Sequence, residues 1–147
     1  MNKVVLDANI YVELFKKDEH DSKIAIELVN TLVKNSVEII ESSVVVNETI
    51  STCEVAKQDI QPARDFFKAL IDFRMRFVNI TPELLDKTIA LTKEGHKKSG
   101  YPTFSDSLYH AIAVQEEALF ITADRRHYEK TKHLGSIQLL KDLHWPQ

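Results

Sequence analysis

The chain has 147 residues, which is the size of one ordinary domain, so we expect a single domain over residues 1–147. Apolar residues make up 44% of the chain and charged residues 28%, with only 3 glycines and 4 prolines, which excludes disordered, collagen-like and low-complexity classes. The formal net charge of −3 at first argues against a polyanionic partner, because nucleic-acid-binding proteins usually carry a basic surplus.

Short apolar runs alternate along the chain with longer stretches whose apolar residues recur at helical spacing. The runs that predict strands are 3–6, 37–40, 77–80 and 119–122, and residues 7–9 after the first run predict a polar turn. The stretches that predict helices are 21–33, 44–55, 62–73, 82–95 and 103–117. The candidate caps of these helices are Ser42, Ser43, Thr103 and Ser105. This alternation predicts an α/β domain with a mainly parallel sheet.

The sequence also indicates where the protein acts. The single cysteine, Cys53, cannot form a disulfide within the chain, and Asp7 interrupts the apolar run that a secretory signal would need. No run approaches the roughly 18 uninterrupted apolar residues of a membrane span. We therefore expect a cytoplasmic protein that does not cross a membrane.

Four acidic residues fall where a parallel sheet would bring them to one edge. Asp7 directly follows the first strand, Glu48 lies early in the helix after the second, and Asp124 lies two residues beyond the strand at 119–122. Asp106 is in the first turn of the helix before that strand, so this helix begins at the same edge. We therefore expect the four carboxylates to lie close together.

Each acid also has a local explanation, because Asp and Glu favour turns and the first turns of helices. Several carboxylates at one edge nevertheless repel one another unless a cation is bound. Oxygen ligands without thiolates favour Mg²⁺ or Mn²⁺. Glu41, which ends the second strand, is the main rival to Glu48, and the six histidines include no pair with the spacing of a zinc site.

The segments that contain these acids resemble the PIN-domain nucleases, and in particular the VapC-type toxins of prokaryotic toxin–antitoxin pairs. The matching motifs are Val-Leu-Asp-Ala-Asn-Ile at 5–10, Val-Val-Asn-Glu at 45–48, Phe-Ser-Asp-Ser-Leu-Tyr-His-Ala-Ile-Ala at 104–113 and Ile-Thr-Ala-Asp at 121–124, followed by Tyr128. Their order and spacing span nearly the whole chain. The resemblance implies a PIN-like three-layer α/β/α domain whose mainly parallel sheet has four to five strands.

The resemblance also implies a function, a Mg²⁺- or Mn²⁺-dependent endoribonuclease that hydrolyses RNA. It implies an RNA substrate, a small antitoxin protein as a partner and a chain able to form a homodimer. The implied metal ligands and catalytic acids are Asp7, Glu48, Asp106 and Asp124. The implied polar helpers are Asn9, where Ser or Thr is commoner in the family, and Thr122.

A metal site would change what the net charge of −3 says about an RNA partner, because four of the acids would then be bound to the metal. Without the four acids, the rest of the chain has 19 basic and 18 acidic residues, which allows a basic rim around an acidic pocket. The basic residues nearest to the acids in sequence, and our candidates for RNA binding, are Arg125, Arg126, Lys97 and Lys98.

Two other functions remain open from the sequence. A haloacid-dehalogenase-like phosphatase also has an Asp after its first strand, but it requires a second Asp two positions later, where this chain has Asn9. A noncatalytic PIN-like module that binds RNA or protein is the other alternative, and the presence of all four acids disfavours it.

Overall fold

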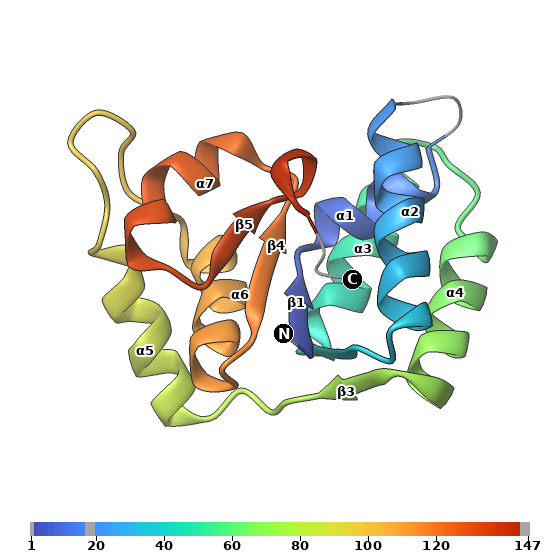
Figure 1. The fold of residues 1–147 in the computed structure, drawn as a ribbon, viewed down its shortest axis with the longest axis horizontal. Helices are drawn as coiled ribbons and strands as arrows, with labels where there is room; N and C mark the ends of the chain where they lie inside the picture. The colour runs from blue at the N-terminus through green and yellow to red at the C-terminus, as the bar shows by residue number, and fades with distance from the viewer. Residues whose placement is uncertain (1, 17–19, 145–147) are drawn as a thin grey trace.

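The computed structural model describes residues 2–16 and 20–144, and over these residues the chain forms a five-stranded sheet. All neighbouring strands are parallel, in the order β3-β2-β1-β4-β5 (Figure 1). The strands are β1 (Lys3–Leu6), β2 (Glu38–Glu41), β3 (Met75–Phe77), β4 (Leu119–Thr122) and β5 (Ile137–Leu139). The expected α/β class with a parallel sheet is therefore confirmed.

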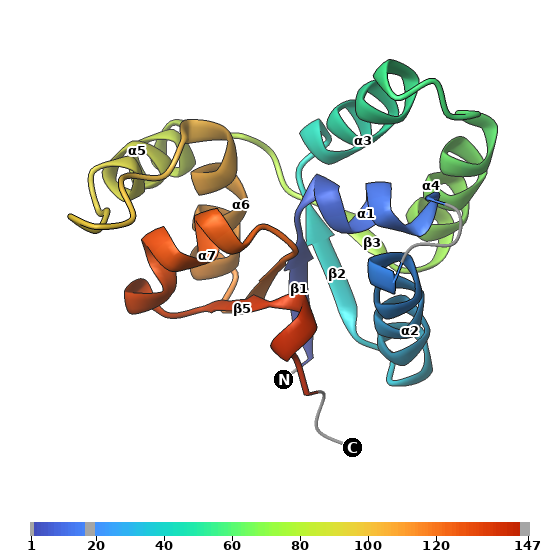
Figure 2. The same ribbon diagram turned by 90° about the horizontal axis from the view of Figure 1, so that it is seen from above.

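Helices cover both faces of this sheet. They are α1 (Ala8–Leu14), α2 (His20–Lys34), α3 (Val44–Val55), α4 (Gln61–Phe73), α5 (Pro82–Thr92), α6 (Phe104–Gln115) and α7 (Arg125–Thr131), with 3-10 turns η1 (Lys132–Leu134) and η2 (Leu140–Asp142). Seen from above, α1 to α4 lie on one side of the sheet and α5 to α7 on the other (Figure 2). The three-layer α/β/α arrangement is confirmed. In the described part of the chain, no helix is long and apolar enough to span a membrane.

The strand order reverses next to β1. The chain steps outwards from β1 through β2 to β3, and then returns to place β4 on the other side of β1. Leu6 at the end of β1 pairs with Ile121 near the end of β4, so the two strands end almost level. In open α/β sheets, ligands bind outside the carboxyl ends of the strands at such a switch point.

The core explains why the last three residues of β1 are all apolar. Val4, Val5 and Leu6 are all fully buried, because β1 lies in the middle of the sheet with helices on both faces. Ile10 of α1 and Ile112 of α6 are also fully buried and belong to the same apolar core as β1. The residues that follow β1 are therefore held in place from both sides.

Several predicted boundaries are wrong. Residues 7–9 are not merely a turn, because Asp7 caps a helix that begins at Ala8. The third strand is Met75–Phe77 rather than 77–80, and its charged Arg76 pairs with Glu38 at 2.5 Å. The elements α7 and β5 were not predicted at all, because both are short.

Only one of the four candidate helix caps forms a capping bond among the described residues. Thr103 caps α6 as expected, since its hydroxyl oxygen accepts a hydrogen bond from the Asp106 backbone N–H at 3.1 Å. Ser43 precedes α3, but its side chain makes no capping bond. The Ser42 hydroxyl is buried without a hydrogen-bond partner among the described residues. Ser105 lies inside α6, and its hydroxyl bonds to Glu48 of α3 instead of capping its own helix.

Candidate active site

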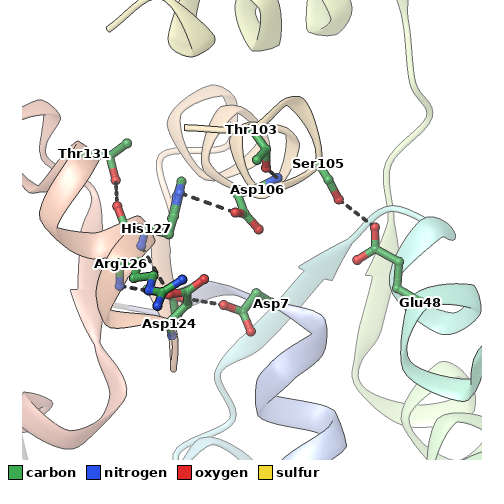
Figure 3. Close-up of polar contacts among 10 residues, drawn as sticks. Asp7, Glu48, Thr103, Ser105, Asp106, Asp124, Arg126, His127 and Thr131 are labelled. Carbon is green, nitrogen blue, oxygen red and sulfur yellow. Dashed lines mark hydrogen bonds and ion pairs between the residues drawn. The ribbon is translucent and has the colours of Figure 1, made fainter. Parts of the chain in front are cut away.

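The four predicted acids come from four separate elements and meet at the carboxyl edge of the sheet (Figure 3). Asp7 follows β1, Asp124 lies just beyond β4, Asp106 is in the first turn of α6, and Glu48 is on α3. Figure 3 shows Asp7, Asp106 and Asp124 on one side of the site, with Glu48 facing them from α3. The parallel topology thus brings all four to the switch point between β1 and β4.

Asp7 is the most deeply buried of the four acids, with 5% of its surface exposed. Its Oδ1 accepts a hydrogen bond from the Ile10 backbone N–H at 3.2 Å, and its Oδ2 accepts one from the Thr122 hydroxyl. The pKa of Asp7 is raised to about 7, mainly by burial and in part by the nearby Asp106 carboxylate, although the hydrogen bonds to Asp7 oppose this. Among the described residues, no basic side chain pairs with Asp7 to balance its charge.

The two predicted helpers differ in position. Thr122 is fully buried, and its hydroxyl donates to Asp7 while accepting from the Asp124 backbone N–H at 3.0 Å. It therefore connects two of the acids. The Asn9 side chain is exposed and makes no hydrogen bond to the acids in the described structure; its backbone N–H, together with that of Ile10, lowers the pKa of Asp7. The structure thus gives the Asn9 side chain no contact that would support a helper role.

Asp106 and Asp124 both lie next to His127, a residue that sequence reasoning missed. Asp124 Oδ1 caps α7 by accepting hydrogen bonds from the backbone N–H groups of Arg126 at 2.9 Å and His127 at 3.3 Å. His127 Nδ1 lies 3.8 Å from Asp106 Oδ2. Burial lowers the pKa of His127, although the charge of Asp106 opposes this.

Glu48 is held by two hydroxyl groups of α6. Its Oε1 accepts a hydrogen bond from Ser105 at 2.9 Å, and its Oε2 accepts one from the Tyr109 hydroxyl at 2.5 Å. Burial and the Glu48 charge raise the pKa of Tyr109, so its hydroxyl remains a donor. Tyr109 was not predicted, although its position three residues after Asp106 places it on the same face of α6.

Glu41, the rival of Glu48, is fully buried beneath this edge. Its Oε1 accepts a hydrogen bond from the Leu6 backbone N–H at 3.2 Å, and its Oε2 has no partner among the described residues. Burial raises the pKa of Glu41 well above its usual value, and the charges of Asp7 and Glu48 raise it further. Glu48 is therefore the acid that faces the other three, and Glu41 lies beneath them.

The acids do not form a closed metal cage. Within residues 2–16 and 20–144, no three His, Cys, Asp or Glu side chains lie close enough to hold a metal ion together. The expectation that all four carboxylates crowd together is therefore too strong. The structure instead places Asp7 beside Asp106 and Thr122, and Glu48 at the hydroxyl groups of α6.

The four candidate RNA-binding residues belong to two segments. Arg125 and Arg126 are exposed at the start of α7, next to Asp124. Lys97 and Lys98 are exposed in the segment between α5 and α6. In the part of the chain that the structure describes, none of the four forms an ion pair with a carboxylate. Their charges are therefore available to a ligand.

Comparison with known proteins identifies the family. The model of the PIN domain matches residues 4–133, which is most of the chain. The chain therefore belongs to the PIN-domain family, as the sequence motifs indicated. The haloacid-dehalogenase-like alternative has no support from this match. A comparison with curated protein sequences gives no match.

Solved structures of toxin–antitoxin proteins share the fold. VapBC2 from Rickettsia felis, bound to a promoter DNA fragment, matches with a TM-score of 0.63 and 20% identity, covering 93% of this chain and 96% of that chain. A toxin–antitoxin complex from Klebsiella pneumoniae matches with a TM-score of 0.64 and 16% identity over 93% and 97%. VapC20 of Mycobacterium tuberculosis, described as a sarcin–ricin loop cleaving toxin, matches with a TM-score of 0.60 and 14% identity over 82% and 87%.

Proposed function

We propose that this PIN-domain protein is a Mg²⁺- or Mn²⁺-dependent endoribonuclease and the toxin of a toxin–antitoxin pair. The observation on which the proposal depends is the meeting of Asp7, Glu48, Asp106 and Asp124, from four elements, at the switch point of the sheet. The fold neighbours add support, because one is described as cleaving the sarcin–ricin loop and two come from toxin–antitoxin complexes. An RNA substrate would place the activity in the cytoplasm.

The side chains at this edge suit a hard divalent cation. The donors are carboxylate and hydroxyl oxygens, with no thiolate among them. Mg²⁺ commonly binds through one or two carboxylates and keeps several waters, so it does not require three or four acids in direct contact. The buried, uncompensated Asp7 next to Asp106 is where a positive charge would relieve the most repulsion. Asp7 and Asp106 are the residues that would hold the ion directly, and Asp124 and Glu48 would act on it through its bound waters.

The remaining roles follow from the contacts of this chain. A bound divalent ion lowers the pKa of water and neutralises charge on the scissile phosphate. Thr122 fixes the carboxylate of Asp7 and the backbone at Asp124, while Tyr109 and Ser105 fix that of Glu48. Arg125, Arg126, Lys97 and Lys98 would contact phosphates of the RNA.

The test is cleavage of a labelled RNA pool by the wild type and by two variants. We expect Asp7→Asn and Asp106→Asn each to reduce cleavage about a hundredfold or more, because the amide keeps the size of the side chain but removes the charge that holds a hard cation. Asp72→Asn, an exposed acid of α4, is the matched control and should cleave like the wild type. Circular dichroism checks that all three variants fold.

EDTA distinguishes the proposal from its alternatives. Wild-type cleavage should stop in EDTA and return with excess Mg²⁺ or Mn²⁺. Cleavage that persists in EDTA, or in folded Asp7→Asn protein, would falsify the proposed mechanism. If the wild type binds RNA and cuts none of it under any condition, the noncatalytic PIN-like module becomes the better description. Co-purification with a small protein encoded beside the gene tests the antitoxin.

A further inference from the structure

A hairpin projects from the molecule between α5 and α6. We call its residues, 93–103, the arm. In Figure 1 it is the loop beside α7. Two backbone hydrogen bonds close the hairpin, from His96 N to Gly100 O at 2.9 Å and from Gly100 N to His96 O at 2.7 Å. The Lys98 N–H also bonds to His96 Nδ1 at 3.2 Å. These bonds give the arm a defined backbone.

The arm holds an exposed aromatic ring in a fixed position. A Cβ atom at Gly95 would lie 2.3 Å from Tyr101 Cδ1 and 2.6 Å from the Gly100 carbonyl oxygen, so only glycine allows the Tyr101 ring to lie this close. Gly100 has a φ of +91°, which also favours glycine. Tyr101 is nevertheless 61% exposed. Its ring therefore rests on Gly95 and presents most of its surface to solvent.

Positive charge lies on the arm and on the neighbouring helix α7. Lys97 and Lys98 are exposed on the arm, and an open groove of about 440 Å³ is lined by Ser99 of the arm and by Arg125, Arg126, Glu129 and Lys130 of α7. The acid in this groove, Glu129, is already paired with Lys132 at 2.7 Å. The groove therefore has a net positive charge, which suits a phosphate.

A second exposed aromatic residue lies closer to the acids in sequence. Phe104, the first residue of α6, is 44% exposed and lies two residues before Asp106. Pro102 is buried and Thr103 caps α6, so the junction between the arm and α6 is held in place. An RNA strand that contacts Phe104 would therefore lie near Asp106, which is in the same first turn of α6.

We propose that the arm is a subsite for single-stranded RNA, in which one base stacks on Tyr101 and a neighbouring phosphate lies in the groove between the arm and α7. This inference rests on the proposed RNA substrate. Exposed aromatic rings combined with basic grooves are typical of single-strand binding, because every base has a face that can stack. The positive charge of the groove favours RNA over an apolar protein partner.

The experiment measures the affinity of a fluorescein-labelled single-stranded RNA by anisotropy, in EDTA to prevent cleavage. Tyr101→Ala should weaken binding about fivefold or more, whereas Tyr101→Phe, which keeps the ring, should stay within about twofold of the wild type. Phe73→Ala is the matched control, because Phe73 is an aromatic residue of α4 that is 80% exposed. It should bind like the wild type.

Two further comparisons separate stacking from charge. Tyr101→Ala should not weaken binding of an RNA duplex, whose bases are already stacked, and should leave the salt dependence unchanged. Arg125→Ala should weaken binding to both RNAs and reduce the slope of log affinity against log salt by about one. Gly95→Ala, which displaces the ring while keeping it, should weaken single-strand binding in the same way as Tyr101→Ala.

The outcomes keep this inference separate from the proposed function. If Tyr101→Ala and the wild type bind single-stranded RNA equally while the wild type still cleaves RNA, the subsite is refuted and the ribonuclease proposal stands. If the wild type neither binds nor cleaves RNA, both are refuted. If Tyr101→Ala changes only the elution volume in size-exclusion chromatography, the arm is a protein contact and the RNA subsite is wrong.

Discussion

Thr122 illustrates how one side chain can serve both the fold and the site. Its β-branched side chain suits a buried strand, and it is fully buried at the end of β4. Its hydroxyl donates to the Asp7 carboxylate and accepts from the Asp124 backbone N–H. The hydroxyl is thus hydrogen-bonded although it is buried, and its two bonds fix the relative positions of Asp7 and Asp124.

At the residue scale, the main prediction concerns the buried carboxyl of Asp7 in metal-free protein. Burial raises its pKa to about 7, so the folded state holds this proton more tightly than the unfolded state. The free energy of unfolding should therefore fall as the pH rises from about 4 to about 7. The amide that Asp7→Asn introduces does not ionise. The free energy of unfolding of this variant, relative to that of the wild type, should therefore rise by about 2–3 kcal/mol between pH 5 and pH 8.

Urea unfolding in EDTA at the two pH values measures this difference. The side-chain amide that Asp7→Asn introduces can still donate to the Thr122 hydroxyl oxygen, so the variant should keep the fold. Asp72→Asn, at an exposed position on α4, should show no such change with pH. A wild-type and Asp7→Asn difference that is the same at pH 5 and pH 8 would contradict the prediction.

At the scale of elements, the site is assembled from the beginnings of helices. Asp7 caps α1, Asp124 caps α7, and Asp106 lies in the first turn of α6. The unpaired N–H groups and the positive end of the dipole at a helix N-terminus stabilise a carboxylate. The local explanation of these acids and the functional one are therefore compatible, because the same helix starts that favour Asp also direct it to one edge.

The cap of α6 provides a test of this view. Thr103→Ala removes the hydroxyl that accepts from Asp106 N–H, and we expect it to cost about 1 kcal/mol of stability. Because Ser105 and Asp106 lie in the same first turn, RNA cleavage should also fall severalfold at a temperature where the variant is fully folded. Thr81→Ala is the matched control, since Thr81 caps α5 through Leu84 N–H at 3.2 Å.

Both variants should lose similar stability in thermal melts, but only Thr103→Ala should lose activity. Equal activity of the two folded variants would show that the first turn of α6 does not need its cap for cleavage.

The sequence predicted those elements whose signal is local. The apolar run of β1 and the cap at Thr103 could be read directly, and the order of strands and helices placed four acids at one edge. The three-residue strand β5 could not be found, because three residues are too few to show a strand pattern. Tyr109 and His127 were missed because their partners, Glu48 and Asp106, come from distant elements.

At the scale of the whole molecule, metal binding should be visible as stability. An ion that binds only the folded chain at 100 times its Kd adds about 2.7 kcal/mol, or about 5–10 °C for a domain of this size. Thermal melts of the full chain with and without millimolar Mg²⁺ or Mn²⁺ measure this shift. Asp106→Asn should lose most of it, and Asp72→Asn should keep it. An unchanged melting midpoint, together with no binding of the metal in calorimetry, would refute the proposed metal site.

The place of β1 between β2 and β4 determines when the site can exist. Asp7 and Thr122 are 115 positions apart, so the ribosome must add 115 residues after Asp7 before the Asp7 carboxylate can meet its partner. Until β4 emerges, β1 has a neighbour only on its β2 side, and the nascent chain lacks Asp106, Thr122 and Asp124 altogether. A chain with the proposed ribonuclease activity therefore cannot assemble its site before residue 124 has been synthesised.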